Sequence, residues 1–82
     1  MEVCFSRHFE QAFAKLTKTD RQVVRKAITL LGENTKYPGL QVKKMEGRDV
    51  WEARASSRLR MTFEMKGESI YLRNVGEHDS VK

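Results

Sequence analysis

The chain has 82 residues and a formal net charge of +5, with 39% hydrophobic and 33% charged residues. This length fits a single domain spanning residues 1–82 with one modest core, and the apolar content is too high for a disordered chain. We expect neither a signal peptide nor a membrane span, because no apolar run approaches roughly 18 residues. One cysteine and two histidines offer no metal-ligand spacing, so we expect no metal or cofactor, and a reducing cytoplasm suits the chain.

The first residues predict a strand followed by a helix. Residues 2–5 are rich in β-branched and aromatic side chains, which is typical of a short strand. Ser6 then stands where a helix N-cap would. Apolar residues follow at the i, i+3, i+4, i+7 spacing of an amphipathic helix: Phe9, Ala12, Phe13 and Leu16.

A second helix is predicted after a break at residues 17–19. Thr19 and Gln22 have the spacing of a capping box and would open the helix. Gly32 would close it. The apolar stripe between them repeats the first one: Val24, Ala27, Ile28 and Leu31. The two stripes therefore predict two antiparallel helices joined by a short turn.

The apolar period changes to two after a turn at Pro38 and Gly39. This period predicts strands at residues 40–45, 50–56, 59–66 and 69–75. The order β-α-α-β-β-β-β indicates an α+β domain. The helix pair would cover one face of a largely antiparallel sheet.

The alternation of residues 50–56 and 59–66 predicts their register. If the apolar faces of both strands meet the helices, Arg54 lies directly opposite Arg60 and Glu52 opposite Thr62. Two arginines facing each other across a ladder repel, so another group must offset their repulsion. Two guanidinium groups and a carboxylate on one open face suit an anion such as a phosphate; a surface ion-pair network is the alternative.

The last hairpin is expected to turn at Gly67 and Glu68. That turn would place Arg73 opposite Thr62, on the same open face. His78 follows the last strand, where a glycine before it can redirect the chain toward this face.

These residues together favour metal-free cleavage of RNA through its own 2′-hydroxyl group. Glu52 would be the base, Arg54 and Arg60 would bind the phosphate, and His78 would be the acid. A basic excess attracts polyanions, and the expected RNA-contacting residues are Lys43, Lys44, Arg48, Arg58 and Arg73. A non-catalytic RNA-binding module with the same charges is an alternative.

Three parts of the sequence carry a family resemblance. They are the pattern Phe5-Ser6-x-x-Phe9, the tract 44–60 with its core Asp49-Val50-Trp51-Glu52-Ala53-Arg54, and the end Val75-Gly76-Glu77-His78-Asp79. The chain resembles the RelE/ParE superfamily, the toxin halves of type II toxin–antitoxin systems. The resemblance runs through nearly the whole chain and implies a β-α-α-β-β-β fold. For the RelE-like branch it also implies ribosome-dependent cleavage of mRNA.

The resemblance assigns the same roles: position 52 to the base, Arg54 and Arg60 to phosphate binding, and His78 to the acid. It also implies an antitoxin partner, and a basic toxin suits an acidic, partly disordered one. The ParE-like branch shares the fold but inhibits DNA gyrase, which is a second alternative. Many relatives carry a tyrosine after the His–Asp pair, whereas this sequence stops at Lys82. A substitute group, weaker cleavage and a trimmed sequence all fit that departure.

Overall fold

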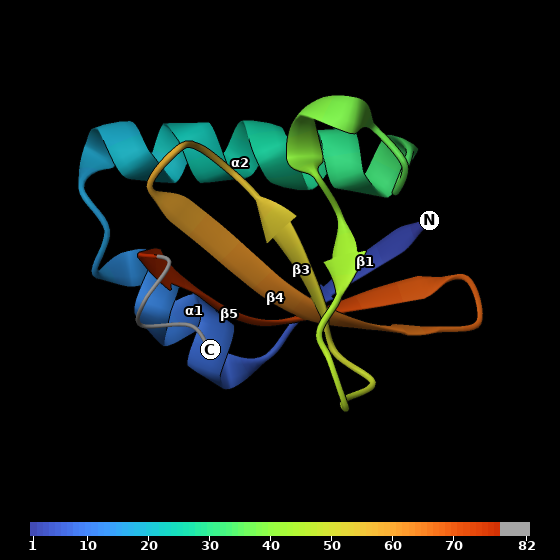
Figure 1. Ribbon diagram of the computed structural model, residues 1–82. Helices are drawn as coiled ribbons and strands as arrows, with labels where there is room; N and C mark the ends of the chain where they lie inside the picture. The colour runs from blue at the N-terminus through green and yellow to red at the C-terminus, as the bar shows by residue number, and fades with distance from the viewer. Residues whose placement is uncertain (78–82) are drawn as a thin grey trace.

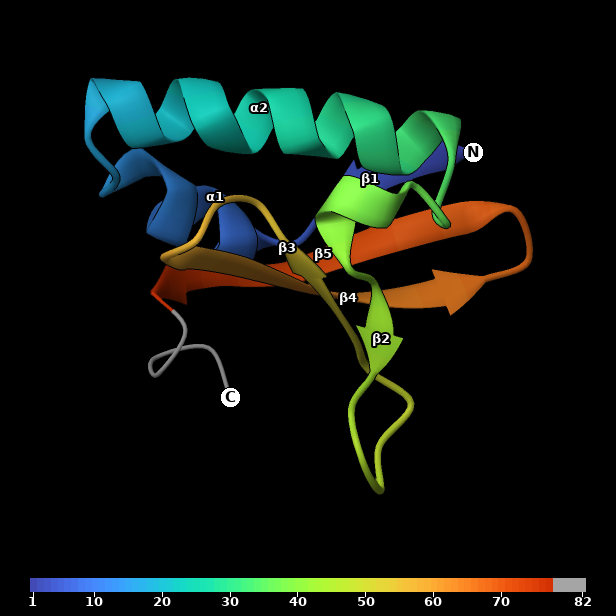
Figure 2. The same cartoon turned by 45° about the horizontal axis from the view of Figure 1, so that its top comes forward.

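The computed structural model describes residues 1–77 and shows two α-helices on one side of a five-stranded sheet (Figures 1 and 2). The sheet order is β1-β5-β4-β3-β2, with β1 parallel to β5 and the other neighbours antiparallel. This arrangement confirms the predicted α+β fold. The elements in chain order are β1 (Glu2–Phe5), α1 (Arg7–Ala14), α2 (Lys18–Glu33), the 3₁₀ helix η1 (Pro38–Leu40), β2 (Lys43–Lys44), β3 (Trp51–Arg54), β4 (Leu59–Lys66) and β5 (Ser69–Glu77).

Both α-helices begin at a hydroxyl side chain. Ser6 caps α1 as predicted, because its Oγ accepts a hydrogen bond from the backbone N–H of Phe9 at 3.0 Å. Thr17 caps α2, where its Oγ1 accepts from the N–H of Asp20 at 3.1 Å. The predicted cap at Thr19 is therefore wrong: Thr17 already satisfies the first turn, and Thr19 lies inside the helix.

The predicted end of α2 at Gly32 is also wrong. The helix continues to Glu33, and Asn34 is its C-cap, with the Asn34 N–H donating to the carbonyl of Leu30 at 2.9 Å. A Cβ atom on Gly32 would lie 3.2 Å from Cγ2 of Val3. Glycine therefore allows α2 to approach β1 closely, and it does not end the helix.

The strand predicted at residues 40–45 is much shorter than expected. Only Lys43–Lys44 pair as a strand, with β3. Leu40 is buried as the last residue of η1, and Gln41 has a left-handed backbone with φ 46°. A left-handed residue cannot continue an extended strand, so pairing starts only beyond it.

The register of β3 and β4 is the predicted one. Arg54 pairs with Arg60, and Glu52 pairs with Thr62. The core-facing residues between them, such as Ala53 and Met61, are fully buried. The polar members of both strands therefore share the opposite face.

The register of β4 and β5 differs from the prediction on one side of a β-bulge. Phe63 pairs with Leu72 as expected, but Thr62 pairs with Asn74. Arg73 is the additional residue of the bulge, so its predicted pairing with Thr62 is wrong. A bulge inserts one residue into one strand and turns the side chains beside it.

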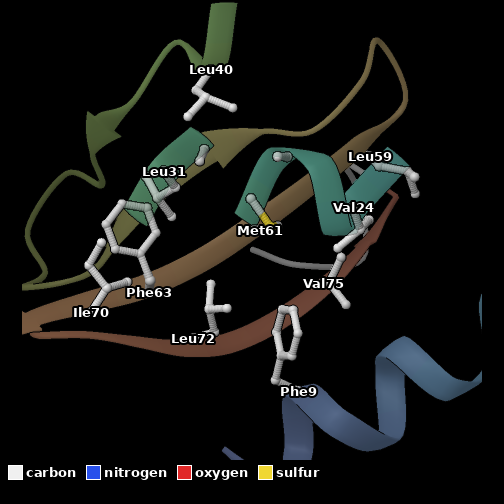
Figure 3. Packing of buried hydrophobic residues seen from close by; sticks show 12 residues of the cluster. Phe9, Val24, Leu31, Leu40, Leu59, Met61, Phe63, Ile70, Leu72 and Val75 are labelled. Atoms are coloured by element: carbon white, nitrogen blue, oxygen red, sulfur yellow. The ribbon is translucent and has the colours of Figure 1, made fainter. Parts of the chain in front are cut away.

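The core lies between the sheet and the helices, where side chains from α1, α2, η1, β4 and β5 converge (Figure 3). No helix within residues 1–77 has the length and apolarity needed to cross a membrane. Since the helices cover one face of the sheet, the other face is left to polar residues. The core residues are Phe9, Val24, Ala27, Leu31, Leu40, Ala53, Leu59, Met61, Phe63, Ile70, Leu72 and Val75.

Candidate functional site

The sheet face opposite the helices brings together three of the four expected catalytic residues. Glu52 and Arg54 are two residues apart on β3, and Arg60 lies across from Arg54 on β4. Because side chains alternate along a strand, all three point away from the core. We call these three residues the Arg–Glu cluster. His78, the fourth expected catalytic residue, lies outside the described residues.

Backbone carbonyls of the β3–β4 loop offset the repulsion between the two arginines. Nη1 of Arg60 donates to the carbonyl oxygens of Ser56, Ser57 and Leu59 at 2.8, 3.3 and 3.1 Å. Nε of Arg54 donates to the same Ser56 oxygen at 3.3 Å. Within residues 1–77, neither Nη2 atom of the pair donates a hydrogen bond. The loop therefore holds two positive charges close together and leaves donors for an anion.

Glu52 is more buried than a water-facing patch predicts. The residue is only 6% exposed, although it lies on the polar face. Its Oε1 is 3.8 Å from Nζ of Lys43 and 4.0 Å from Nε of Arg60. Both distances are too long for direct hydrogen bonds. The carboxylate thus lies between two cations, with lone pairs left to accept a proton from a third group.

A groove of about 500 Å³ lies beside the Arg–Glu cluster. It is formed by β4, β5, the β2–β3 loop and the start of α1; in Figure 2 the β2–β3 loop projects away from α2. Thr62, the partner of Glu52, lines the groove, so the two features adjoin. Three cations outnumber one carboxylate along it. The ionisable lining side chains are His8, Arg48, Glu64, Lys66, Tyr71 and Arg73.

Three of the expected RNA-contacting residues lie around the cluster and the groove, and a fourth, Lys44, pairs with the β2–β3 loop. Arg48 and Arg73 line the groove. Lys43 contacts Glu52, and Nζ of Lys44 lies 3.3 Å from Oδ1 of Asp49 in the β2–β3 loop. Both lysine side chains are more than half exposed, at 68% and 53%, so they remain accessible to a polyanion.

Arg58, the fifth expected RNA-contacting residue, connects the β3–β4 loop to α2 and β5. From the β3–β4 loop its guanidinium donates to both carboxylate oxygens of Asp20 in α2, at 2.8 and 2.9 Å, and to Oε1 of Glu77 in β5 at 3.2 Å. The hydrogen bond and charge of Asp20, followed by those of Glu77, raise the pKa of Arg58 above its ordinary value. Two carboxylates already neutralise much of the positive charge that an RNA contact would use.

Two residues of this site did not emerge from the sequence. Glu64 lies on the groove, with its carboxylate 3.5 Å from Nε of Arg73 and 3.7 Å from Nζ of Lys66. It has the same parity on β4 as Arg60, so the alternation alone predicts its face. Gln41 accepts a hydrogen bond from Nη1 of Arg54 at 3.2 Å. No sequence pattern indicated that contact, because the sequence predicted Gln41 inside a strand, whereas it lies between η1 and β2.

Comparison with known proteins finds no matching family model and no matching curated protein, but it finds similar solved structures. A copper-bound mutant toxin from Helicobacter pylori has a TM-score of 0.81 at 19% identity, over 100% of this chain and 99% of that one. YafQ from E. coli has a TM-score of 0.82 at 13% identity, over 98% and 96% of the two chains. The RelB–RelE antitoxin–toxin complex of Methanococcus jannaschii gives 0.76 at 20% identity, over 95% and 93%. The described residues therefore have the α+β fold of the RelE/ParE toxins.

Proposed function

We propose that this protein is the toxin of a type II toxin–antitoxin system and cleaves mRNA on the ribosome without a metal ion. The observation that carries the proposal is the Arg–Glu cluster, a carboxylate beside two arginines at the edge of a basic groove. The likeness in fold to toxins such as YafQ and RelE supports it. A ribosomal substrate would place the activity in the cytoplasm.

The proposed chemistry uses the nucleophile that RNA itself carries. Glu52 removes the proton of the 2′-hydroxyl, and the 2′-oxygen attacks the adjacent phosphorus. Arg54 and Arg60 stabilise the additional negative charge of the pentacoordinate phosphorane. His78 donates a proton to the 5′-oxygen as its bond to phosphorus breaks. The products are a 2′,3′-cyclic phosphate and a free 5′-hydroxyl.

The groove is the proposed path for the RNA strand on one side of the scissile phosphate. Arg48 and Arg73 would contact its backbone there, Lys43 would contact it beside Glu52, and Lys44 would contact it at the β2–β3 loop. Arg58 is the remaining proposed contact, although it already engages Asp20. Phosphate contacts of this kind supply affinity without sequence preference.

The proposed protein partner is an acidic, partly disordered antitoxin that covers the same face. The net charge of +5 favours such a partner by electrostatic attraction. Antitoxin and RNA would compete for the groove because both would bind the same arginines through negatively charged groups. Binding of the antitoxin would thereby inactivate the toxin.

The decisive experiment compares Glu52→Gln with the wild-type protein on ribosomes programmed with a defined mRNA. Glutamine keeps the shape of the side chain but cannot accept the proton, so cleavage should fall by about 10²–10⁴-fold. The melting temperature should stay within a few degrees. Glu68→Gln, at the exposed β4–β5 turn, is the matched control and should cleave as the wild type does.

Each other outcome points elsewhere. Undiminished cleavage by Glu52→Gln would show that Glu52 is not the base. Wild-type protein that binds RNA but yields no cyclic phosphate would indicate a non-catalytic RNA-binding module. Intact transcripts together with a DNA-damage response in expressing cells would indicate gyrase inhibition.

A further inference from the structure

We propose that Gln41 is a positioning residue that orients Arg54 for phosphate binding. This inference rests on the proposed function, because it concerns one of the two arginines of the Arg–Glu cluster. Gln41 lies between η1 and β2, outside both strands of the cluster. Its backbone conformation is unusual, and its side chain contacts Arg54.

The backbone of Gln41 is left-handed, with φ 46° and ψ 50°. Among residues 1–77 it is the one non-glycine residue with positive φ. The conformation turns the chain from η1 into β2, and the Gln41 N–H donates to the carbonyl of Pro38 at 3.1 Å. Glycine would adopt it without strain, whereas a side chain with a Cβ is disfavoured there. A strained residue persists where its side chain contributes something that glycine cannot.

The side chain of Gln41 contributes a hydrogen bond to Arg54. Oε1 accepts from Nη1 of Arg54 at 3.2 Å, while Nε of Arg54 donates to the carbonyl of Ser56 at 3.3 Å. Two separate segments thus fix two nitrogens of one planar group, which defines the plane of the guanidinium. Without Gln41, a single bond would hold Arg54 against the repulsion from Arg60.

An amide is the suitable acceptor for this purpose. A carboxylate at the same place would hold Arg54 more strongly, but it would also neutralise the charge that a phosphate needs. The amide of Gln41 orients the guanidinium and leaves its full positive charge in place. The geometry therefore assigns Gln41 to orientation and Arg54 to charge.

The first test is Gln41→Gly, which should lower activity without lowering stability. Glycine relieves the left-handed strain, so the melting temperature should stay level or rise. Cleavage of mRNA on programmed ribosomes should fall by about 5–20-fold, within the range seen for residues that share a hydrogen-bond network. Gln41→Asn also tolerates the left-handed backbone, but its shorter amide cannot span the same distance, so it should lose similar activity. Gln11→Ala, at an exposed site on α1, is the control and should change neither quantity.

A double-mutant cycle with Arg54 tests whether Gln41 acts through that residue. In an Arg54→Ala background, Gln41→Gly should change cleavage by less than about two-fold, since nothing is left to orient. An equal loss in both backgrounds would overturn the proposal. So would full activity of Gln41→Gly in the otherwise wild-type protein.

A structural measurement separates this inference from the proposed function. The NMR order parameter of the Arg54 Nε–H group should be high in the wild type and clearly lower in Gln41→Gly. If the wild type cleaves no RNA but shows this difference, the nuclease proposal fails and the positioning role stands. If Arg54 is equally ordered in both proteins, the positioning role fails, whatever the protein cleaves.

Discussion

One hydroxyl group joins the start of α1 to the strand beside the groove. Ser6 Oγ accepts from the N–H of Phe9 at 3.0 Å and donates to the carbonyl of Arg73 at 3.1 Å. Phe9 is a core residue, and Arg73 lines the groove. The same oxygen therefore caps a helix and fixes the position of the β5 bulge relative to it.

We expect Ser6→Ala to destabilise the protein more than Thr17→Ala. Loss of a hydroxyl cap alone costs about 0.5–2 kcal/mol, and Ser6 loses a second, half-buried hydrogen bond worth about 1 kcal/mol. Thr17 makes only the cap, at an exposed site. Urea unfolding of both variants measures the difference in the free energy of unfolding. Equal losses would show that the bond to Arg73 contributes nothing.

At single residues, local sequence patterns predicted one helix cap correctly and one helix end wrongly. Ser6 was predictable as a cap because the next residues carry a clear helical stripe. Gly32 was misread because a glycine after such a stripe looks the same whether it ends the helix or admits a neighbour. Its neighbour is Val3, far away in the sequence, so only the tertiary structure distinguishes the two roles.

At the scale of elements, Arg58 holds the start of α2 and the far end of β5 to the β3–β4 loop. Asp20 lies in the first turn of α2, where a negative charge is also favourable to the helix dipole. Glu77 is the last residue of β5. Since the Arg–Glu cluster uses carbonyls of the same loop, this ion pair also holds the cluster's acceptors in place.

We expect Arg58→Gln and Asp20→Asn each to lower the melting temperature. The melting temperature of the double variant should lie near that of the less stable single variant. Because the pKa of Arg58 is raised, its stabilising contribution is complete below the ordinary arginine pKa and is lost only above it. The difference in melting temperature between wild type and Arg58→Gln should therefore stay constant from about pH 6 to about pH 10. Thermal melts across that range measure it. A difference that disappears within the range would contradict this account of the pair.

Strand alternation predicted β3 and β4 better than it predicted their neighbours. One face of both strands is buried. A slip of one residue would move every apolar side chain to the opposite, solvent-facing side of the sheet, so the apolar pattern alone was enough to predict the register. The bulge in β5 is an insertion of one residue, and the sequence marks it only by the step of three from Leu72 to Val75, where an unbroken alternation would place the next core residue at position 74. The late start of β2 depends on the left-handed Gln41, which a sequence of residue types does not reveal.

At the scale of the whole molecule, the open face of the sheet combines the Arg–Glu cluster with the groove beside it. The cluster was predictable in outline, because parity places Glu52, Arg54 and Arg60 on one face. The groove was not predictable, because the β2–β3 loop, two strands and the start of α1 form it together. The burial of Glu52 was not predictable either, because it depends on Lys43, which reaches Glu52 from the neighbouring strand.

We expect binding of a single-stranded 2′-deoxy oligonucleotide, which cannot be cleaved, to weaken steeply with salt. Each phosphate contact contributes about 0.7 to the slope of log K against log salt concentration. Arg48→Gln and Arg73→Gln should each flatten the slope by about that amount. Fluorescence anisotropy between low and moderate salt measures it. Lys18→Gln, exposed on α2 above the opposite face, is the control, and an equal effect there would show that net charge alone is responsible.

The pairing of β1 with β5 affects the order in which the protein can fold. Among the described residues, the first strand, Glu2–Phe5, lies beside the last, Ser69–Glu77, in parallel register. During synthesis, β1 therefore lacks its sheet partner until residues 69–77 have left the ribosome. Residues Glu2 and Ser69 of the two strands are 67 positions apart in the sequence, so closing this edge of the sheet costs more chain entropy than forming the local hairpins, and we expect it to form late in folding.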